Sequence, residues 1–155
     1  MLNRMELTFL SRAQNEAFAR VAIAAFVVQL NPTLPEMADV KTAVSEAVTN
    51  AIVHGYAGRE DGLVTIAASY DDRRELTVCV RDTGCGIRDV ATAMLPFYST
   101  GDGAERSGMG FCVMQTFMDA VEVDSTVDEG TTVILRKHIA GESALHRERV
   151  LDEIG

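Results

Sequence analysis

The sequence predicts an α+β fold: a two-layer sandwich in which a mixed, mostly antiparallel sheet carries helices on one face. Two observations lead to this class. Short segments of alternating apolar and polar residues come in pairs, as expected for hairpins of a sheet with one buried face. Longer segments with apolar residues at helical spacing separate them, so the predicted order is β-α-α-β-β-loop-α-β-β.

The first two elements are a strand and a helix. Residues 5–10 alternate between apolar and polar types and form the strand. Ser11 followed by Gln14 has the spacing of a capping box, which predicts that a helix starts at Ser11. Asn31 stands before a proline and ends this helix, because the residue that precedes proline disfavours helical geometry.

The second helix is the element around which the predicted site is arranged. A capping box at 33–36, with proline in the first turn, opens this helix, and it ends near Gly55. Glu46, Asn50 and His54 lie on one side of it as successive i, i+4 neighbours, opposite an apolar stripe. Charged residues are rare in this part of the helix, so we predict that something other than water covers the polar side.

The remaining elements follow the same two patterns. They are strands at 63–70 and 75–82, a short helix at 88–95, a mobile loop at 98–107, an apolar helix at 108–118, and strands at 120–127 and 131–138. Alternation in the second of these strands places Asp82 at its end, on the buried side. We predict a single domain at 1–140 and a charged C-terminal tail at 141–155, either a loose helix or irregular.

Composition argues against several classes of protein. The formal net charge of −9 would repel phosphates, so we expect neither direct DNA binding nor attachment to an acidic membrane. The longest apolar run, residues 21–28, is too short to span a bilayer, and the charged N-terminal segment is unlike a signal peptide. Cys79, Cys85 and Cys112 contain no C-x-x-C pair and are odd in number, so we expect reduced thiols and a cytoplasmic protein.

Several catalytic motifs are missing from the sequence. It has no P-loop, no Rossmann fingerprint, no H-E-x-x-H and no nucleophile elbow. Residues 82–84 match the D-T-G of aspartic proteases, but that family places an apolar residue before the aspartate, and here Arg81 stands there. We therefore set the protease interpretation aside.

Three blocks taken together are more specific than any one of them. They are E-x-x-x-N at 46–50 on a helix, D-x-G-x-G at 82–86 after a strand, and G-x-G at 108–110 opening a helix, followed by G-T-T at 130–132. In this order the blocks resemble the Bergerat-fold (GHKL) ATPase superfamily, which includes DNA gyrase and the histidine kinases. The resemblance extends from about residue 5 to residue 138 and implies that 1–140 is an ATP-binding domain.

In such a site the aspartate block is predicted to bind the base. The Asp82 carboxylate can accept a hydrogen bond from the exocyclic amine of adenine, while Gly84 and Gly86 let the backbone approach the base. Thr131 is predicted to support the same end of the base. A hydrogen bond to a charged partner is worth about 1.5–3 kcal/mol, or roughly ten- to a hundredfold in affinity.

The G-x-G block is predicted to hold the phosphates. Gly108 and Gly110 open a helix whose free N–H groups and dipole favour anions. Arg106, just before them, can reach the terminal phosphate. The other nucleotide contacts predicted in this region are Thr100, Ser107 and Met109.

The central helix is predicted to supply the metal ligand and the base. Asn50 offers a neutral oxygen for Mg²⁺, which prefers oxygen ligands and bridges the phosphates of ATP or ADP. Glu46, one turn earlier, then lies near the terminal phosphate, where it can act as a general base. His54 is predicted to have a structural role at the helix end.

Two longer stretches resemble one branch of this superfamily. Residues 45–56 (SEAVTNAIVHGY) and 105–111 (ERSGMGF) are very similar to the anti-sigma F factors of spore-forming bacteria. The resemblance implies a homodimer that holds the sporulation sigma factor sigma-F inactive and phosphorylates a serine of an anti-anti-sigma protein with Mg-ATP. It also implies that Arg20 lies on the partner-binding surface. The apolar first helix and strand predict that the dimer forms through the N-terminal region.

Two alternatives stay open at this point. One is an anti-sigma binding module that uses the nucleotide only as a structural ligand, without kinase turnover. The other is a stress-response anti-sigma kinase of the same family, which differs only in its partner. Glu46 and the lid-like loop at 98–107 favour a kinase over a binding module.

Overall fold

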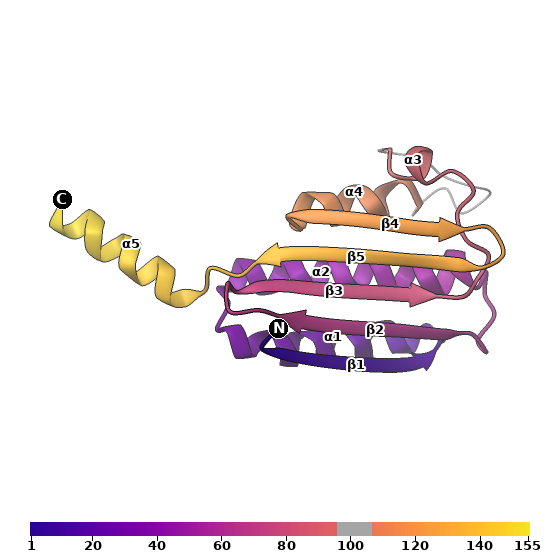
Figure 1. Ribbon diagram of the computed structural model, residues 1–155, viewed down its shortest axis with the longest axis horizontal. Helices are drawn as coiled ribbons and strands as arrows, with labels where there is room; N and C mark the ends of the chain where they lie inside the picture. The colour runs from indigo at the N-terminus through magenta and orange to yellow at the C-terminus, as the bar shows by residue number, and fades with distance from the viewer. Residues whose placement is uncertain (96–106) are drawn as a thin grey trace.

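The computed structural model describes residues 1–95 and 107–155, with the backbone alone at 107–109 and 145. The loop predicted to be mobile, residues 98–107, lies outside these described residues except for residue 107. Figure 1 shows the elements, which are β1 (Asn3–Leu10), α1 (Gln14–Val27), the short 3-10 helix η1 (Val28–Leu30), α2 (Leu34–Thr49), the π-helical turn η2 (Asn50–Gly55), β2 (Leu63–Tyr70), β3 (Glu75–Asp82), α3 (Val90–Ala93), α4 (Ser107–Phe117), β4 (Ala120–Thr126), β5 (Gly130–His138) and α5 (Glu142–Ile154).

The five strands form one sheet in the order β1-β2-β3-β5-β4. The helices α1, α2 and α4 cover one face of this sheet (Figure 1), which confirms the predicted two-layer α+β class. Each of the four strand pairs is antiparallel, so the sheet lacks the parallel pair that a mixed sheet would contain. Because β3 lies in the middle of the order, its last residue, Asp82, is enclosed on both sides.

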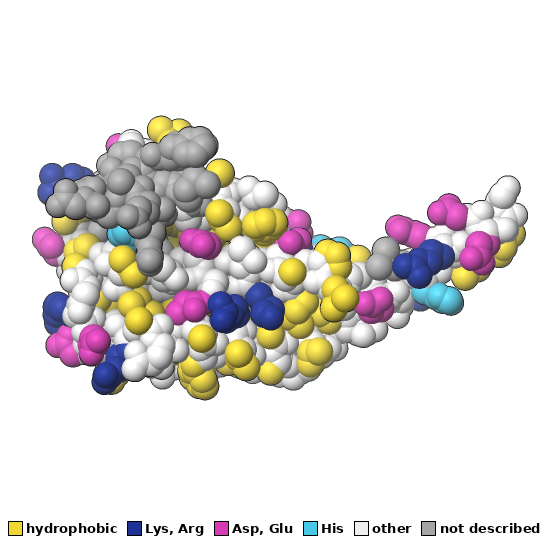
Figure 2. Space-filling view, turned by 180° about the vertical axis from the view of Figure 1, so that it is seen from behind, with side chains coloured by type: hydrophobic (Ala, Val, Ile, Leu, Met, Phe, Trp, Pro, Cys, Tyr) yellow, Lys and Arg dark blue, Asp and Glu magenta, His cyan; other side chains and the backbone are white. Residues whose placement is uncertain are grey.

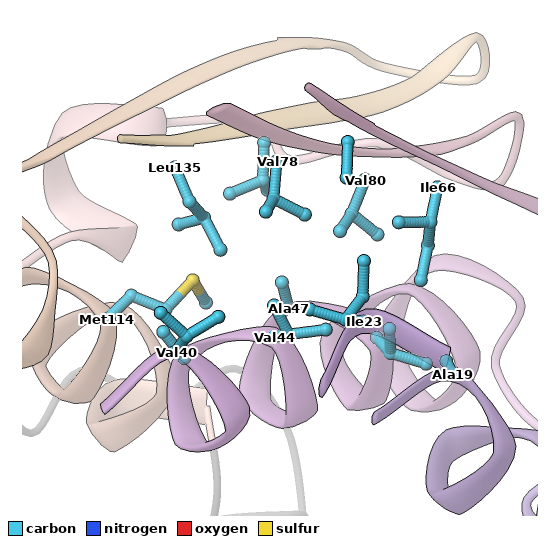
Figure 3. Packing of buried hydrophobic residues seen from close by; sticks show 14 of the residues in the cluster. Ala19, Ile23, Val40, Val44, Ala47, Ile66, Val78, Val80, Met114 and Leu135 are labelled. Atoms are coloured by element: carbon cyan, nitrogen blue, oxygen red, sulfur yellow. The ribbon is translucent and has the colours of Figure 1, made fainter. Parts of the chain in front are cut away.

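The core lies between α2 and the sheet, with α1 and α4 on either side of α2 (Figure 3). The residues labelled there are Val40, Val44 and Ala47 from α2, Ala19 and Ile23 from α1, Met114 from α4, and Ile66, Val78, Val80 and Leu135 from the sheet. All of them are at most 2% exposed. Burying one large aliphatic side chain stabilises a fold by about 1.5–3 kcal/mol. This packing fixes α2 and therefore the position of its polar side.

The capping box predicted at Ser11 is wrong. Helix α1 begins at Gln14, its N-cap is Ala13, and no side chain caps it. The Ser11 hydroxyl is buried; it donates to Arg59 O at 2.6 Å and accepts from Gly62 N at 3.1 Å. Serine hydroxyls bind backbone groups in several ways, and here a partner distant in sequence replaces the local one. Ser11 thus connects the end of β1 to the loop before β2.

The second predicted capping box is confirmed at the start of α2. The Thr33 hydroxyl accepts from Glu36 N at 3.2 Å, and the Glu36 carboxylate accepts from Thr33 N at 2.9 Å. Just before it, Asn31 ends η1 with a left-handed φ of 48°. The helical segment ends near residue 55 as predicted, but its last part, η2, is a π-helical turn. Such turns are rare and often occur at functional sites.

The end of β5 is tied to the body before α5 begins. The Glu36 carboxylate accepts from Ala140 N at 2.7 Å and Gly141 N at 3.0 Å, and the Arg74 guanidinium donates to Ile139 O at 2.7 Å. Helix α5 then points away from the body (Figures 1 and 2), so the predicted tail is helical, whereas the domain boundary at 140 stays a prediction. In the described part of the chain, no helix has both the length and the apolar character needed to cross a membrane.

Candidate functional site

Asp82 ends the central strand and is only 5% exposed. Its carboxylate accepts from Gly84 N at 2.9 Å, and the N–H of Thr131 on β5 is a second donor. Burial raises the pKa of the Asp82 carboxyl group, and the two amide donors oppose that rise only in part. A carboxylate has about four acceptor positions, so these two amides leave it able to bind an N–H group of a ligand.

The two glycines after Asp82 are required by close backbone contacts. A Cβ on Gly84 would overlap the carbonyl oxygen of Gly55, which accepts from Cys85 N at 2.8 Å. A Cβ on Gly86, whose φ is +73°, would overlap the carbonyl oxygen of Thr126. These contacts fix the loop between η2 and the β4–β5 hairpin. They are a second reason for glycine here, beside the predicted approach of the backbone to a base.

Thr131 lies opposite Asp82 in the β3–β5 register and is 5% exposed. Its hydroxyl forms a 2.8 Å hydrogen bond with the hydroxyl of Ser125, which also accepts from Ile87 N at 2.7 Å. Ser125 therefore links Ile87, which follows the glycine loop, to β4. Ser125 was not predicted from the sequence, because its role follows from its pairing with Thr131 across the β4–β5 hairpin.

The polar side of α2 connects the two halves of the site. Glu46 Oε2 lies 3.4 Å from the point that a Cβ on Gly110 would occupy, so Glu46 reaches the first turn of α4. Asn50 follows one turn later and opens η2. At the other end of η2, a Cβ on Gly55 would lie 2.9 Å from Asp82 Oδ1. The row from Glu46 to Gly55 thus runs from the start of α4 to the buried carboxylate.

The beginning of α4 has the character of an anion site. The first N–H groups of a helix have no intrahelical acceptor, and the helix dipole places partial positive charge there. Because Glu46 lies beside this turn, a phosphate bound at the first turn of α4 would be close to the Glu46 carboxylate. Ser107, Gly108, Met109 and Gly110 form the turn. Thr100 and Arg106, which were predicted to contact the nucleotide, lie outside the described residues.

The available metal ligands fit Mg²⁺ held mainly by a nucleotide. Within residues 1–95 and 107–155, no three His, Cys, Asp or Glu side chains gather to hold a metal ion. The half-buried side chain of Asn50 offers one neutral oxygen. Mg²⁺ usually keeps several waters and is bound by one or two protein oxygens together with substrate phosphates. Asn50 therefore suits a metal that arrives with ATP or ADP.

Arg20 is held between α1 and α2. Its guanidinium donates to Glu16 at 3.1 Å and to the Ser45 hydroxyl at 3.3 Å. Arg20 and Glu46 line the same open cavity of about 430 Å³, together with Lys41. The predicted partner-binding residue and the predicted base are thus accessible from one surface.

Helix α1 and the adjoining η1 expose large apolar side chains. Phe18 is 52% exposed, Val21 63% and Val28 60%. Figure 2 shows hydrophobic side chains gathered on the helical face of the molecule. Contiguous apolar patches on soluble proteins often mark contact sites for other proteins. This surface adjoins Arg20 and suits a protein partner.

Comparison with known proteins is consistent with this geometry. A family model described as a histidine kinase-like ATPase domain matches residues 9–137. Fold and site thus define an ATPase-type domain of this class. The anti-sigma F factor of Clostridium novyi is 55% identical over 137 residues, 88% of this chain and 95% of that protein. The anti-sigma F factor of Priestia megaterium is 49% identical over 145 residues, 94% of this chain and 99% of that protein. The chain therefore belongs to the anti-sigma F factor family.

Solved structures show the same fold. The RsbU and RsbW domains of a Mycobacterium tuberculosis protein match with a TM-score of 0.66 and 18% identity, over 88% of this chain and 32% of that one. The mycobacterial sensor histidine kinase MprB matches with a TM-score of 0.55 and 14% identity, over 84% of this chain and 97% of that one. At these identities the likeness concerns the fold alone. The predicted Bergerat fold and the resemblance to anti-sigma F factors are both confirmed.

Proposed function

We propose that this protein is an anti-sigma factor and an ATP-dependent protein serine kinase. It holds a sigma factor of the sigma-F type inactive and phosphorylates a serine of an anti-anti-sigma protein. The observation that carries the proposal is the cavity shared by Arg20 and Glu46, because a protein bound at Arg20 has direct access to the base. The names of the relatives in the anti-sigma F factor family support the sigma-factor partner.

In this proposal the nucleotide lies along the polar side of α2. Asp82 accepts the adenine amine, with Thr131, Gly84 and Gly86 around the same end. Asn50 binds Mg²⁺, which when present neutralises phosphate charge. The phosphates lie at the first turn of α4, where the proposed contacts are Thr100, Arg106, Ser107, Gly108, Met109 and Gly110. The support for this pose is the close approach of Glu46 to Gly110 at one end of this polar side and of Gly55 to Asp82 at the other.

Glu46 is the proposed general base. Its carboxylate accepts the proton of the substrate serine as the serine oxygen bonds to the γ-phosphorus, and the bond from that phosphorus to the oxygen of ADP breaks. ADP leaves with the electron pair of that bond. Arg20 orients the partner, and the amides at the start of α4 stabilise the charge on the transferred group.

We further propose a cytoplasmic homodimer that forms through the N-terminal region. The support is the exposed apolar surface of α1 with Phe18 and Val21, which continues to Val28 in η1. Light scattering at working concentration distinguishes a dimer from a monomer of 16.8 kDa. A mass that stays at the monomer value would contradict this part of the proposal.

The direct test of function combines two assays. The protein is incubated with γ-labelled ATP, Mg²⁺ and a candidate anti-anti-sigma protein, and the label is traced to a residue. In parallel, a pull-down measures binding of a sigma-F type factor. Labelled serine together with sigma-factor capture supports the proposal. Capture without any labelled serine would instead support a binding module without turnover, and capture of a stress-response sigma factor would change the partner.

A further inference from the structure

Tyr56 is the first residue after η2 and is 5% exposed. Its hydroxyl donates to Leu63 O and accepts from Thr83 N at 2.8 Å. The Thr83 hydroxyl is a further neighbour, 3.2 Å away. One buried phenol thus links the start of β2 to the residue that directly follows Asp82.

This bond is part of a series that holds the loop after Asp82. The N–H groups of three successive residues have three different acceptors. Thr83 N donates to Tyr56, Gly84 N donates to Asp82 itself, and Cys85 N donates to a backbone oxygen at the end of η2. Of these acceptors, the Tyr56 hydroxyl is the one supplied by a side chain outside the loop. It therefore sets the direction in which the chain leaves β3.

The ring of Tyr56 is held in a fixed position. It packs so close to Gly62 that a Cβ there would overlap ring carbons of Tyr56. Gly62 is in turn held by Ser11, through Ser11 N to Gly62 O at 2.8 Å and Gly62 N to the Ser11 hydroxyl at 3.1 Å. Because the ring is confined in this way, the hydroxyl has a defined position.

We propose that Tyr56 is a positioning residue for nucleotide recognition. Through Thr83 it holds the Asp82 carboxylate at the angle at which it meets the base, and it touches no substrate itself. This inference rests on the proposed role of Asp82 as the acceptor of the adenine amine. It assigns Tyr56 to affinity and to selection between bases, not to phosphate transfer.

The test compares Tyr56→Phe with Tyr70→Phe. The first change removes only the hydroxyl that holds Thr83. The second removes a hydroxyl that donates to Gln29 at 2.8 Å, at the far end of β2. We expect Tyr56→Phe to weaken ATP binding about tenfold and to reduce the preference for ATP over GTP, because Thr83 N loses its acceptor and Leu63 O loses its donor. Transfer at saturating ATP should stay within about twofold of the wild type, and Tyr70→Phe should match the wild type throughout.

The outcomes separate this inference from the proposed function. If the wild type binds neither ATP nor ADP, both are overturned. If the wild type binds ATP and Tyr56→Phe binds it equally well with the same base preference, only the role of Tyr56 is overturned. Amide hydrogen exchange in the wild type is a second test that needs no variant. The Thr83 amide should exchange slowly, and exchange at the rate of an open loop would contradict the inference even if Tyr56→Phe does not fold.

Discussion

Replacing Asp82 by asparagine changes one atom type at the buried end of the candidate site. The new side chain has the same shape, and its oxygen can still accept from Gly84 N. It carries no charge, and its amide nitrogen cannot accept a hydrogen bond from an adenine amine. The variant therefore removes the proposed base contact and keeps one oxygen that can serve the Gly84 and Thr131 amides.

The expected size follows from this one lost bond. A hydrogen bond to a charged group contributes about 1.5–3 kcal/mol, so ATP should bind about ten- to a hundredfold more weakly to Asp82→Asn. Titration calorimetry measures the affinity directly. Asp71→Asn is the matched control, because Asp71 also accepts from two backbone amides, those of Arg73 and Glu75, in the β2–β3 turn. Wild-type affinity in Asp82→Asn would refute the assignment of Asp82.

The pH dependence tests the same residue in another way. Burial raises the pKa of Asp82 in the folded protein above its value in the unfolded chain. The contribution of Asp82 to the stability of the nucleotide-free protein is therefore fully present below the unfolded pKa and is lost as the pH rises through the folded pKa. Nucleotide binding needs the ionised form of Asp82, so the affinity for ATP changes with pH in the opposite direction to this stability contribution. As the pH is lowered, ATP affinity should therefore start to fall at a pH above about 3.9, which is the pKa of an ordinary aspartate. In Asp82→Asn this fall should be absent.

Two further substitutions test the supports of the site. Ser11→Ala leaves Gly62 N and Arg59 O without their partner, so it should lower the free energy of unfolding by about 1–3 kcal/mol in urea titrations. Ser143→Ala on the exposed side of α5 is the control. An equal effect of the two substitutions would contradict the role of Ser11. Gly84→Ala forces a Cβ against Gly55 O and should weaken ATP binding at least about tenfold in calorimetry, because the loop must move. Unchanged binding in Gly84→Ala would show that this contact does not position the loop.

The parts of the site that were predictable are those in which chemistry dictates the residue type. A carboxylate on a helix, an aspartate after a strand and a glycine pair at a helix start are recognisable because few other residues can replace them. Strand alternation also placed Asp82 on the buried side, where it is found. The second capping box was predictable because all its bonds lie within four consecutive residues.

The parts that were missed depend on contacts between distant segments. Ser11 has the local spacing of a helix cap, yet a loop some fifty residues later takes its hydroxyl. The roles of Ser125 and Tyr56 could not be predicted, because their partners are set by strand register and by the close approach of η2 to β3. The π-helical turn was also not foreseen, since its hydrogen bonds differ from those of an α-helix by only one residue in spacing.

Single-turnover transfer by Glu46→Gln is the most direct test of Glu46 as the general base. The variant keeps the size of the side chain and its place beside Gly110 but cannot accept the serine proton. Enzyme, Mg-ATP and the serine substrate are mixed at saturating concentrations, with Glu75→Gln at the far end of β3 as the control. We predict that ATP affinity is retained, that the transfer rate falls about a hundredfold or more, and that Glu75→Gln behaves as the wild type. Transfer by Glu46→Gln at the wild-type rate would contradict it.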